Sequence, residues 1–157
     1  MSKAFTRESD EAGEEPLIRA ELPPGTRNYI TRQGAERLRE QLGELLGKKQ
    51  ATPAVDQPKI ESAIRRAQQV LESVIIADTP ADRDKIAFGA TVEIRRGNGE
   101  AETYRIVGVD EAAPERGAIS WISPLARALR SGRKGDKIRF RAPAGEDEFT
   151  ILSVRYE

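Results

Sequence analysis

Apolar residues in the first half of the chain recur with the spacing of α-helices. Intervals of three and four residues place side chains on one face of a helix, where they can be buried together. Two such stripes flank the polar stretch 47–60: Ala35, Leu38, Leu42 and Leu45, then Ile60, Ile64, Ala67, Leu71 and Val74. The pattern predicts one helix from Thr31 to about Lys49 and a second helix from Gln57 to about Ile76.

Polar residues mark the expected ends of both helices. Thr31 can cap the first helix, and Asp56 or Gln57 can cap the second, which has Pro58 in its first turn. Because the turn is only about seven residues long, the two stripes favour a short antiparallel coiled coil over residues 29–78. The alternative is that both helices pack on the following domain as ordinary core helices.

Three glycines in the first helix argue against the hairpin. Each glycine inside a helix costs about 1 kcal/mol relative to alanine. They are Gly34, Gly43 and Gly47. The apolar stripes still favour two paired helices, because each stripe can be buried against the other.

From Phe88 onward the apolar pattern alternates, as in strands. Val92 and Ile94 precede the dipeptide 98–99, Asn-Gly, and Tyr104 and Ile106 follow it, which is a strong hairpin signal. Further strands are predicted in "AISWI", "KIRFR" and "EFTILSVRY". Residues 79–157 are therefore predicted to form a small antiparallel sheet, and the chain as a whole an α+β fold.

One short helix is predicted within this sheet domain. Ser123 can cap it, Pro124 fits its first turn, and Gly132 is placed to end it. Its apolar residues Leu125 and Leu129 lie on one face. The only tryptophan, Trp121, lies just before this helix and is read either as a core residue or as a partly exposed contact residue.

Composition excludes several classes of site. The chain has no cysteine and no histidine, so disulfides, thiolate chemistry, zinc sites with the usual ligands and histidine catalysis are ruled out. Its 26 basic and 26 acidic residues balance, which argues against a purely electrostatic nucleic-acid binder. The longest aliphatic run, Val74–Ala77, cannot span a bilayer, so we expect a soluble cytoplasmic protein without membrane contact. Residues 1–28 are read as an acidic flexible tail, which serves as a contact arm or as a screen for a basic surface, or is a plain solvated leader.

Several segments together resemble the Gre family of bacterial transcription elongation factors. They are "NYITRQGAERLREQL", "FGATVEIRR", "YRIVGVDE", "ISPLARALRSGRKGD" and "PAGEDEFTILSVRYE", and the resemblance covers about residues 28–157. It implies an N-terminal antiparallel coiled coil and an FKBP-like C-terminal domain. It also implies a partner, bacterial RNA polymerase, which the C-terminal domain grips at the rim of the secondary channel. Contact with nucleic acid is expected only indirectly, within the transcription complex.

The turn between the helices departs from the family pattern. Gre factors that stimulate transcript cleavage carry paired acids there, which help the polymerase hold its second metal ion. This chain has Lys48, Lys49 and the single acid Asp56 at the turn, and Asp56 is more simply a helix cap. Helices of about 20 residues reach about 30 Å, roughly 15 Å short of the family's reach. Shortened hairpins of this kind also occur in the related Rnk proteins.

The resemblance also assigns binding residues. The polymerase-contact motif is matched as a unit by Ser123, Pro124, Leu125, Ala126, Arg127 and Leu129. A basic patch that could meet an acidic polymerase surface or nucleic acid follows at Arg130, Arg133, Lys134, Lys137 and Arg139, with Arg127 and Arg141 at its ends. The plain alternatives are core packing for Leu125 and Leu129 and a solvated rim for the cations.

These observations favour a polymerase-binding regulator without cleavage stimulation. The chain is expected to be a monomer, not itself an enzyme, with no cofactor and no metal site. One alternative is an active cleavage factor in which Asp56 reaches the polymerase metal. A second is an FKBP-like prolyl isomerase, which rests on fold resemblance alone and has few aromatic residues to line a pocket.

Overall fold

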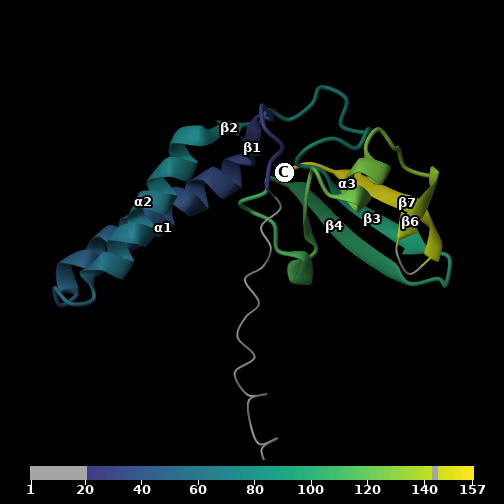
Figure 1. Cartoon of the computed structure of the whole chain (residues 1–157). Coiled ribbons are helices and arrows are strands. Elements are labelled where there is room, and N and C mark those ends of the chain that lie inside the picture. Colours follow the sequence, from purple (N-terminus) through teal and green to yellow (C-terminus); the bar gives the residue numbers. More distant parts are fainter. Residues whose placement is uncertain (1–20, 143–144) are drawn as a thin grey trace, which may run out of the picture.

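The computed structural model describes residues 21–142 and 145–157 and has two parts, a pair of helices and a sheet domain (Figure 1). Most of the predicted acidic tail therefore lies outside the described residues. Among the described residues, no helix has both the length and the hydrophobicity needed to span a membrane.

The two predicted helices are confirmed as α1 (Arg32–Ala51) and α2 (Gln57–Ser73). They lie side by side, joined by a short turn at the end that points away from the sheet domain (Figure 1). Their shared seam is thin. Ala35, Ile64 and Ala67 are buried, whereas Leu38, Leu42 and Leu45 are only half-buried. The helices therefore project from the sheet domain with modest apolar contact between them.

The second helix is shorter than predicted. Val74–Ile76, expected to continue α2, instead forms strand β2, which pairs in parallel with β1 (Asn28–Ile30). The run Val-Ile-Ile is β-branched, which favours an extended backbone when a partner strand is available. That partner strand comes from the segment before α1. Main-chain hydrogen bonds therefore join the segment that precedes α1 to the segment that follows α2.

Of the two N-terminal caps predicted for α1 and α2, one is confirmed. Thr31 caps α1, since its Oγ1 accepts a hydrogen bond from Gly34 N at 3.0 Å. Asp56 precedes α2, but its side chain makes no capping hydrogen bond, so this prediction is wrong. Asp56 has the helical angles φ −99° and ψ −9° rather than the extended angles of a capping residue. The Gln57 side chain instead donates to Thr52 O at 3.2 Å.

Five strands form the sheet domain in the order β5-β4-β3-β7-β6. Their bounds are β3 Thr91–Arg96, β4 Ala101–Val107, β5 Ala118–Ser120, β6 Lys137–Ala142 and β7 Gly145–Arg155. Strands β3 and β4 are joined by the predicted hairpin. The sheet is mixed, not purely antiparallel as predicted, because β5 pairs in parallel with β4. The connection from β4 to β5 includes a short 3-10 helix, η1 (Pro114–Arg116), and returns the chain in the same direction.

The predicted short helix is α3 (Pro124–Leu129), which covers the core of the sheet domain. That core contains Ile94, Leu129, Phe149 and Ile151, each no more than 1% exposed. Gly132 was expected to end α3, but the helix ends at Leu129, and the residue with left-handed backbone angles after it is Ser131, with φ 69°. Gly132 is needed for close packing, since a Cβ there would lie 2.6 Å from Ile151 Cδ1.

Candidate functional site

The residues of α3 divide into a buried and an exposed set. Ser123 caps the helix, accepting a hydrogen bond from Ala126 N at 3.3 Å. Ala126 and Leu129 are buried in the core, at 2% and 0% exposure. Pro124 and Arg127 are exposed, and Leu125 is half-buried. Of the six residues assigned to a partner contact, Ala126 and Leu129 are therefore closed to a partner and instead hold α3 on the sheet.

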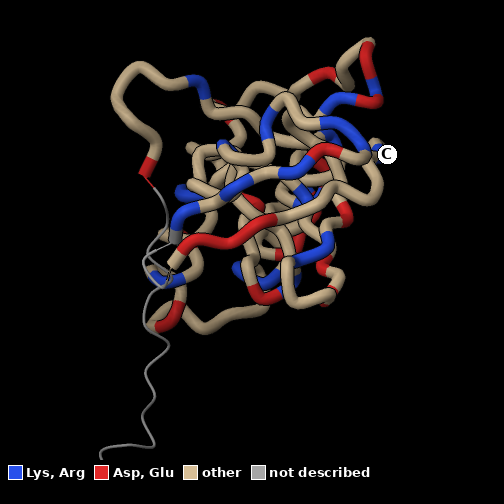
Figure 2. The backbone as a smooth tube through the Cα atoms, turned by 90° about the vertical axis from the view of Figure 1, so that its right-hand side faces the viewer, with Lys and Arg blue, Asp and Glu red and all other residues tan. Residues whose placement is uncertain are grey.

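The predicted basic patch is partly neutralised within the fold. Arg133 forms an ion pair with Asp82, and this contact lowers the pKa of the Asp82 carboxyl. On the adjacent strands, Arg139 lies opposite Glu148 in register, and residues 141 and 146 form a second Arg/Glu pair. Figure 2 shows this basic strand beside an acidic one. Opposite charges facing each other across two strands attract, so β6 is less basic than its sequence indicates.

Four other cations in this region do not face a described acidic partner in the way that Arg133 and Arg139 do. Arg127, Arg130, Lys134 and Lys137 are exposed, and none forms an ion pair with another described residue. They come from α3, from the loop after it and from the start of β6. We call these four residues the cationic face.

Trp121 connects the cationic face to the base of the helix pair. The Arg130 guanidinium lies over its ring, 5.9 Å from the centroid. Its ring also meets Tyr29 edge-on at 5.6 Å and Phe88 at 6.4 Å. Trp121 is half-buried and packs against the core. It is therefore both a core residue and a partly exposed one, the two alternatives that the sequence left open.

The turn between α1 and α2 carries little acid. The Lys49 ammonium lies 3.2 Å from Glu61 Oε1, which occupies that carboxylate within the fold. Lys48 and Asp56 are exposed, and Val55 is 83% exposed. Within the described ranges, no group of three or more potential metal ligands comes together. The turn thus presents one carboxylate that forms no ion pair with another described residue, that of Asp56, near lysines and an exposed apolar side chain.

Sequence reasoning missed the residue that joins the two parts of the molecule, Glu111. Its Oε2 accepts hydrogen bonds from Thr31 N at 3.0 Å and from Gly108 N at 2.8 Å, and its Oε1 accepts from Thr31 Oγ1. The carboxylate lies at the N-terminus of α1, where the helix dipole favours negative charge. The one local signal was Gly34. A Cβ there would lie 1.9 Å from Glu111 Oε1, which explains this glycine inside a helix.

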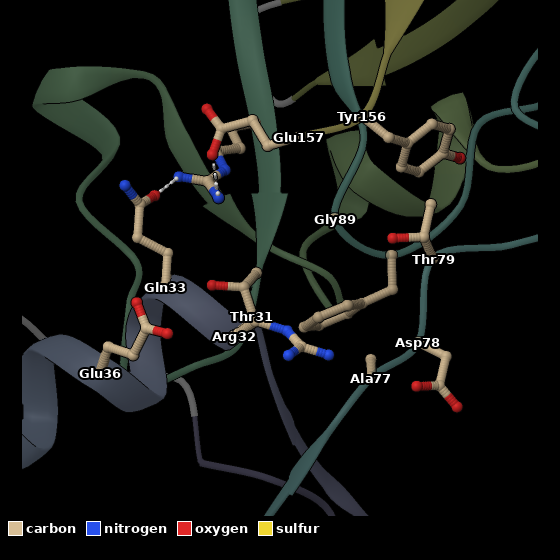
Figure 3. Close-up of a pocket in the computed structure, with 12 residues that line it drawn as sticks. Thr31, Arg32, Gln33, Glu36, Ala77, Asp78, Thr79, Gly89, Tyr156 and Glu157 are labelled. Carbon is tan, nitrogen blue, oxygen red and sulfur yellow. Dashed lines mark hydrogen bonds and ion pairs between the residues drawn. The ribbon is translucent and has the colours of Figure 1, made fainter.

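A cavity of about 330 Å³ lies at the same joint (Figure 3). Arg105 bridges its walls, donating to Gln33 Oε1 at 2.6 Å and to Glu157 Oε2 at 3.2 Å. Arg32 and Glu36 contribute further charges of both signs. Since the charges are mixed and Arg105 is already engaged on both sides, the cavity is best explained as part of the joint.

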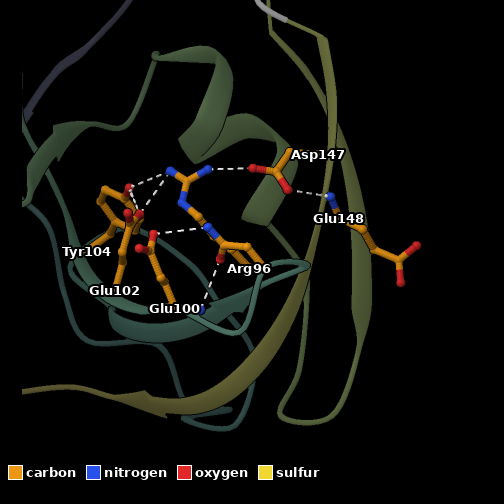
Figure 4. Close-up of polar contacts among 7 residues, drawn as sticks. Arg96, Glu100, Glu102, Tyr104, Asp147 and Glu148 are labelled. Atoms are coloured by element: carbon orange, nitrogen blue, oxygen red, sulfur yellow. Dashed lines mark hydrogen bonds and ion pairs between the residues drawn. The ribbon is translucent and has the colours of Figure 1, made fainter.

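A second polar cluster stabilises the far end of the sheet. The Arg96 guanidinium lies between Glu102 at 2.9 Å and Asp147 at 2.5 Å, and it also donates to Tyr104 (Figure 4). It lies over the Phe149 ring, 5.1 Å from the centroid. Hydrogen bonds from Arg96 and then Tyr104 lower the pKa of the Glu102 carboxyl. The cluster joins β3, β4 and β7.

Replacing Arg96 with glutamine is expected to destabilise the protein by about 1–2 kcal/mol at neutral pH. A carboxyl whose pKa is lowered by folding contributes stability above its unfolded pKa of about 4.5, and loses that contribution as pH falls through the folded value. The difference between Arg96→Gln and the parent should therefore shrink at about pH 3. Chemical denaturation at both pH values measures it, with the exposed neighbour Arg95→Gln as control. An equal loss at both pH values would contradict this.

Comparison with known proteins identifies the family. A family model described as "Transcription elongation factor, GreA/GreB, C-term" matches residues 80–156. The transcription elongation factor GreB of Neisseria meningitidis serogroup A is 34% identical, over 83% of this chain and 95% of the relative. The corresponding GreA of Methylococcus capsulatus is 37% identical, over 81% and 96%. A solved GreA/GreB structure from Nitrosomonas europaea covers 83% of this chain and 99% of its own, with 20% identity and a TM-score of 0.44. The chain belongs to the GreA/GreB family of transcription elongation factors.

Proposed function

We propose that this protein binds bacterial RNA polymerase at the rim of the secondary channel and regulates transcript elongation without stimulating transcript cleavage. The helix pair acts as a short antiparallel coiled coil that points into the channel, and the FKBP-like sheet domain makes the grip. Membership of a family of elongation factors supports the general role. The absence of cleavage stimulation is argued from this chain's own turn.

The turn between α1 and α2 is the observation that carries the proposal. The resemblance implies that cleavage-stimulating Gre factors present two carboxylates at this turn, which can help hold a metal ion of the polymerase and orient the attacking water. Glu61 is paired with Lys49, which leaves Asp56 as the one acid in the turn. Lys48, Lys49 and Lys59 belong to the same turn region as this single carboxylate. Their positive charges repel a divalent cation, so the carboxylate is poorly suited to bind one.

The length of the helix pair supports the same conclusion. Helix α1 has 20 residues and therefore spans about 30 Å. The alignment with the Neisseria relative is 157 positions long. It covers 83% of this chain, which is about 130 of its 157 residues. About 27 positions of the alignment are therefore gaps in this chain. The Methylococcus alignment, with 154 positions and 81% of the chain, leaves about 27 as well. Helices shorter by about ten residues each, as this proposal has them, would account for most of that difference.

The exposed residues of α3 provide the grip in this proposal. Pro124, Leu125 and Arg127 are accessible, and Arg130 extends the same surface toward Trp121. An apolar side chain beside arginines is a typical contact surface for another protein. Ala126 and Leu129 support it from beneath, since both are in the core.

Two measurements on a backtracked elongation complex test the proposal. We expect the protein to bind polymerase and to leave the rate of transcript cleavage at the level of the polymerase alone, whereas a cleavage-competent Gre factor assayed in parallel accelerates it. Robust acceleration by this protein would overturn the proposal. Failure to bind polymerase would overturn it as well.

The variant Asp56→Asn separates the proposal from an active cleavage factor. Because the Asp56 side chain makes no capping hydrogen bond, we expect its stability to change by less than about 0.5 kcal/mol. Binding to polymerase and the cleavage rate should also stay the same. If the parent accelerates cleavage and Asp56→Asn abolishes that effect, Asp56 contacts the polymerase metal.

A further inference from the structure

The cationic face lacks a partner within the described part of the chain. Arg127, Arg130, Lys134 and Lys137 are all exposed, and none has an ion-pair partner there. The nearby Arg133, by contrast, is paired with Asp82. The four cations come from α3, the loop after it and the start of β6, and α3 contacts β6. Like charges on such neighbouring segments repel one another, so an anionic partner would relieve that repulsion.

The chain itself contains a segment of matching charge. Residues 8–15, "ESDEAGEE", hold five acids in eight positions and no lysine or arginine. We propose that this acidic run binds the cationic face of the same molecule and competes there with RNA polymerase. The competition rests on the proposed function, whereas the contact between run and face does not.

The acidic run is close enough in the chain to reach the face. Glu8 and Glu15 precede Glu21, the first described residue, by 13 and 6 positions, which can span up to about 43 and 20 Å. Tyr29 lies against Trp121 at 5.6 Å between ring centroids, and the Arg130 guanidinium lies over that same Trp121 ring. The chain therefore passes beside the cationic face at Tyr29, eight positions after Glu21, and the acidic run is attached to that same segment.

Tethering makes weak ion pairs effective. Exposed ion pairs between separate molecules contribute little, but a segment of the same chain is present at millimolar effective concentration. Such a contact is strong enough to screen the face and weak enough for a docking polymerase to displace it. Removing the acids should therefore tighten polymerase binding by about threefold to tenfold.

Trp121 is a built-in reporter of this contact. It is the only tryptophan, and its ring lies under Arg130. The test compares the full-length parent with a full-length variant carrying E8Q, D10N, E11Q, E14Q and E15Q. We expect the NMR signals of the Trp121 indole N–H and of the Arg130 amide to differ between the two. The difference should vanish at about 1 M NaCl, where the Debye length falls to about 3 Å.

A charge-matched control removes five exposed acids elsewhere, and should keep the parent's signals at these two positions. Its substitutions are E40Q, E44Q, E72Q, D78N and E115Q. Identical spectra for the parent and the acidic-run variant would overturn the proposal. So would a difference that grows with protein concentration, because the acidic run would then bind a second copy.

Polymerase binding by the same three proteins separates the two proposals. The expected result is a lower Kd for the acidic-run variant than for the parent and the control. If no form binds polymerase while the NMR difference persists, the proposed function fails and the internal contact stands. If all forms bind equally, the contact does not compete with polymerase and the screening role is overturned.

Discussion

Replacing Glu111 with alanine is expected to lower the free energy of unfolding by about 2–4 kcal/mol. The Glu111 carboxylate accepts hydrogen bonds from two backbone N–H groups, of Thr31 and Gly108, and from the Thr31 hydroxyl. Alanine would leave both N–H groups without their acceptor and would remove the negative charge at the start of α1. Chemical denaturation measures the loss.

Two further variants show whether the carboxylate itself is responsible. Glu111→Gln keeps the shape and one acceptor oxygen, so its loss should be smaller, about 1–2 kcal/mol. Glu115→Ala removes an exposed acid in the same connection and should change stability by less than about 0.5 kcal/mol. A loss of equal size in Glu111→Ala and Glu115→Ala would contradict the role given to Glu111.

The contact between Glu111 and Thr31 also fixes the direction of the helix pair. Glu111 lies in the sheet domain and Thr31 begins α1, so their contact joins the two parts directly. Hydrogen exchange of the first-turn amides of α1 should become faster in Glu111→Ala than in the parent. In the proposed function, a helix pair without a fixed direction enters the secondary channel less readily, so polymerase affinity should fall together with this protection.

The second large effect is expected for Leu129→Ala, at about 2–5 kcal/mol. Leu129 is 0% exposed and packs in the core beneath α3. Removing the Leu129 side chain leaves a cavity in the core. The control variant Arg127→Ala removes an exposed side chain and should change stability by less than about 0.5 kcal/mol. Denaturation midpoints of the two variants test the division of α3 into a buried and an exposed set.

Polymerase binding should rank the two variants in the opposite order. Under conditions where both are folded, Arg127→Ala should weaken binding by about threefold or more, because it removes an accessible contact. Leu129→Ala should retain binding in proportion to its folded fraction. If the folded Leu129→Ala protein loses binding completely while Arg127→Ala binds like the parent, the assignment of the grip to exposed residues is wrong.

Local patterns predicted much of the fold. The apolar stripes predicted α1 and α2, the Asn-Gly dipeptide predicted the β3–β4 hairpin, and Thr31 and Ser123 were recognised as helix caps. Each of these depends on residues within a few positions of one another, so the sequence displays them directly. The family resemblance, shown by the relatives, likewise depends on the order of short segments.

Several features of the candidate site were beyond such reasoning. The motif around α3 predicted a contact surface, but a motif does not distinguish Arg127, which is exposed, from Leu129, which is in the core. The run of cations after it did not reveal that Arg133 is paired with Asp82, 51 positions earlier. Burial and pairing depend on which strands become neighbours, and this is settled only when the sheet forms.

By itself, the sequence determined the helices, most of the strands, two of the caps and the poverty of acids in the turn between α1 and α2. Only the tertiary structure decided that Val74–Ile76 is a strand, that β5 runs parallel to β4, and that Glu111 supplies the charge at the start of α1. The first set depends on neighbours along the chain. The second depends on groups up to 80 positions apart, whose contacts leave no periodic pattern in the sequence and are stabilised only once the two parts of the molecule are assembled.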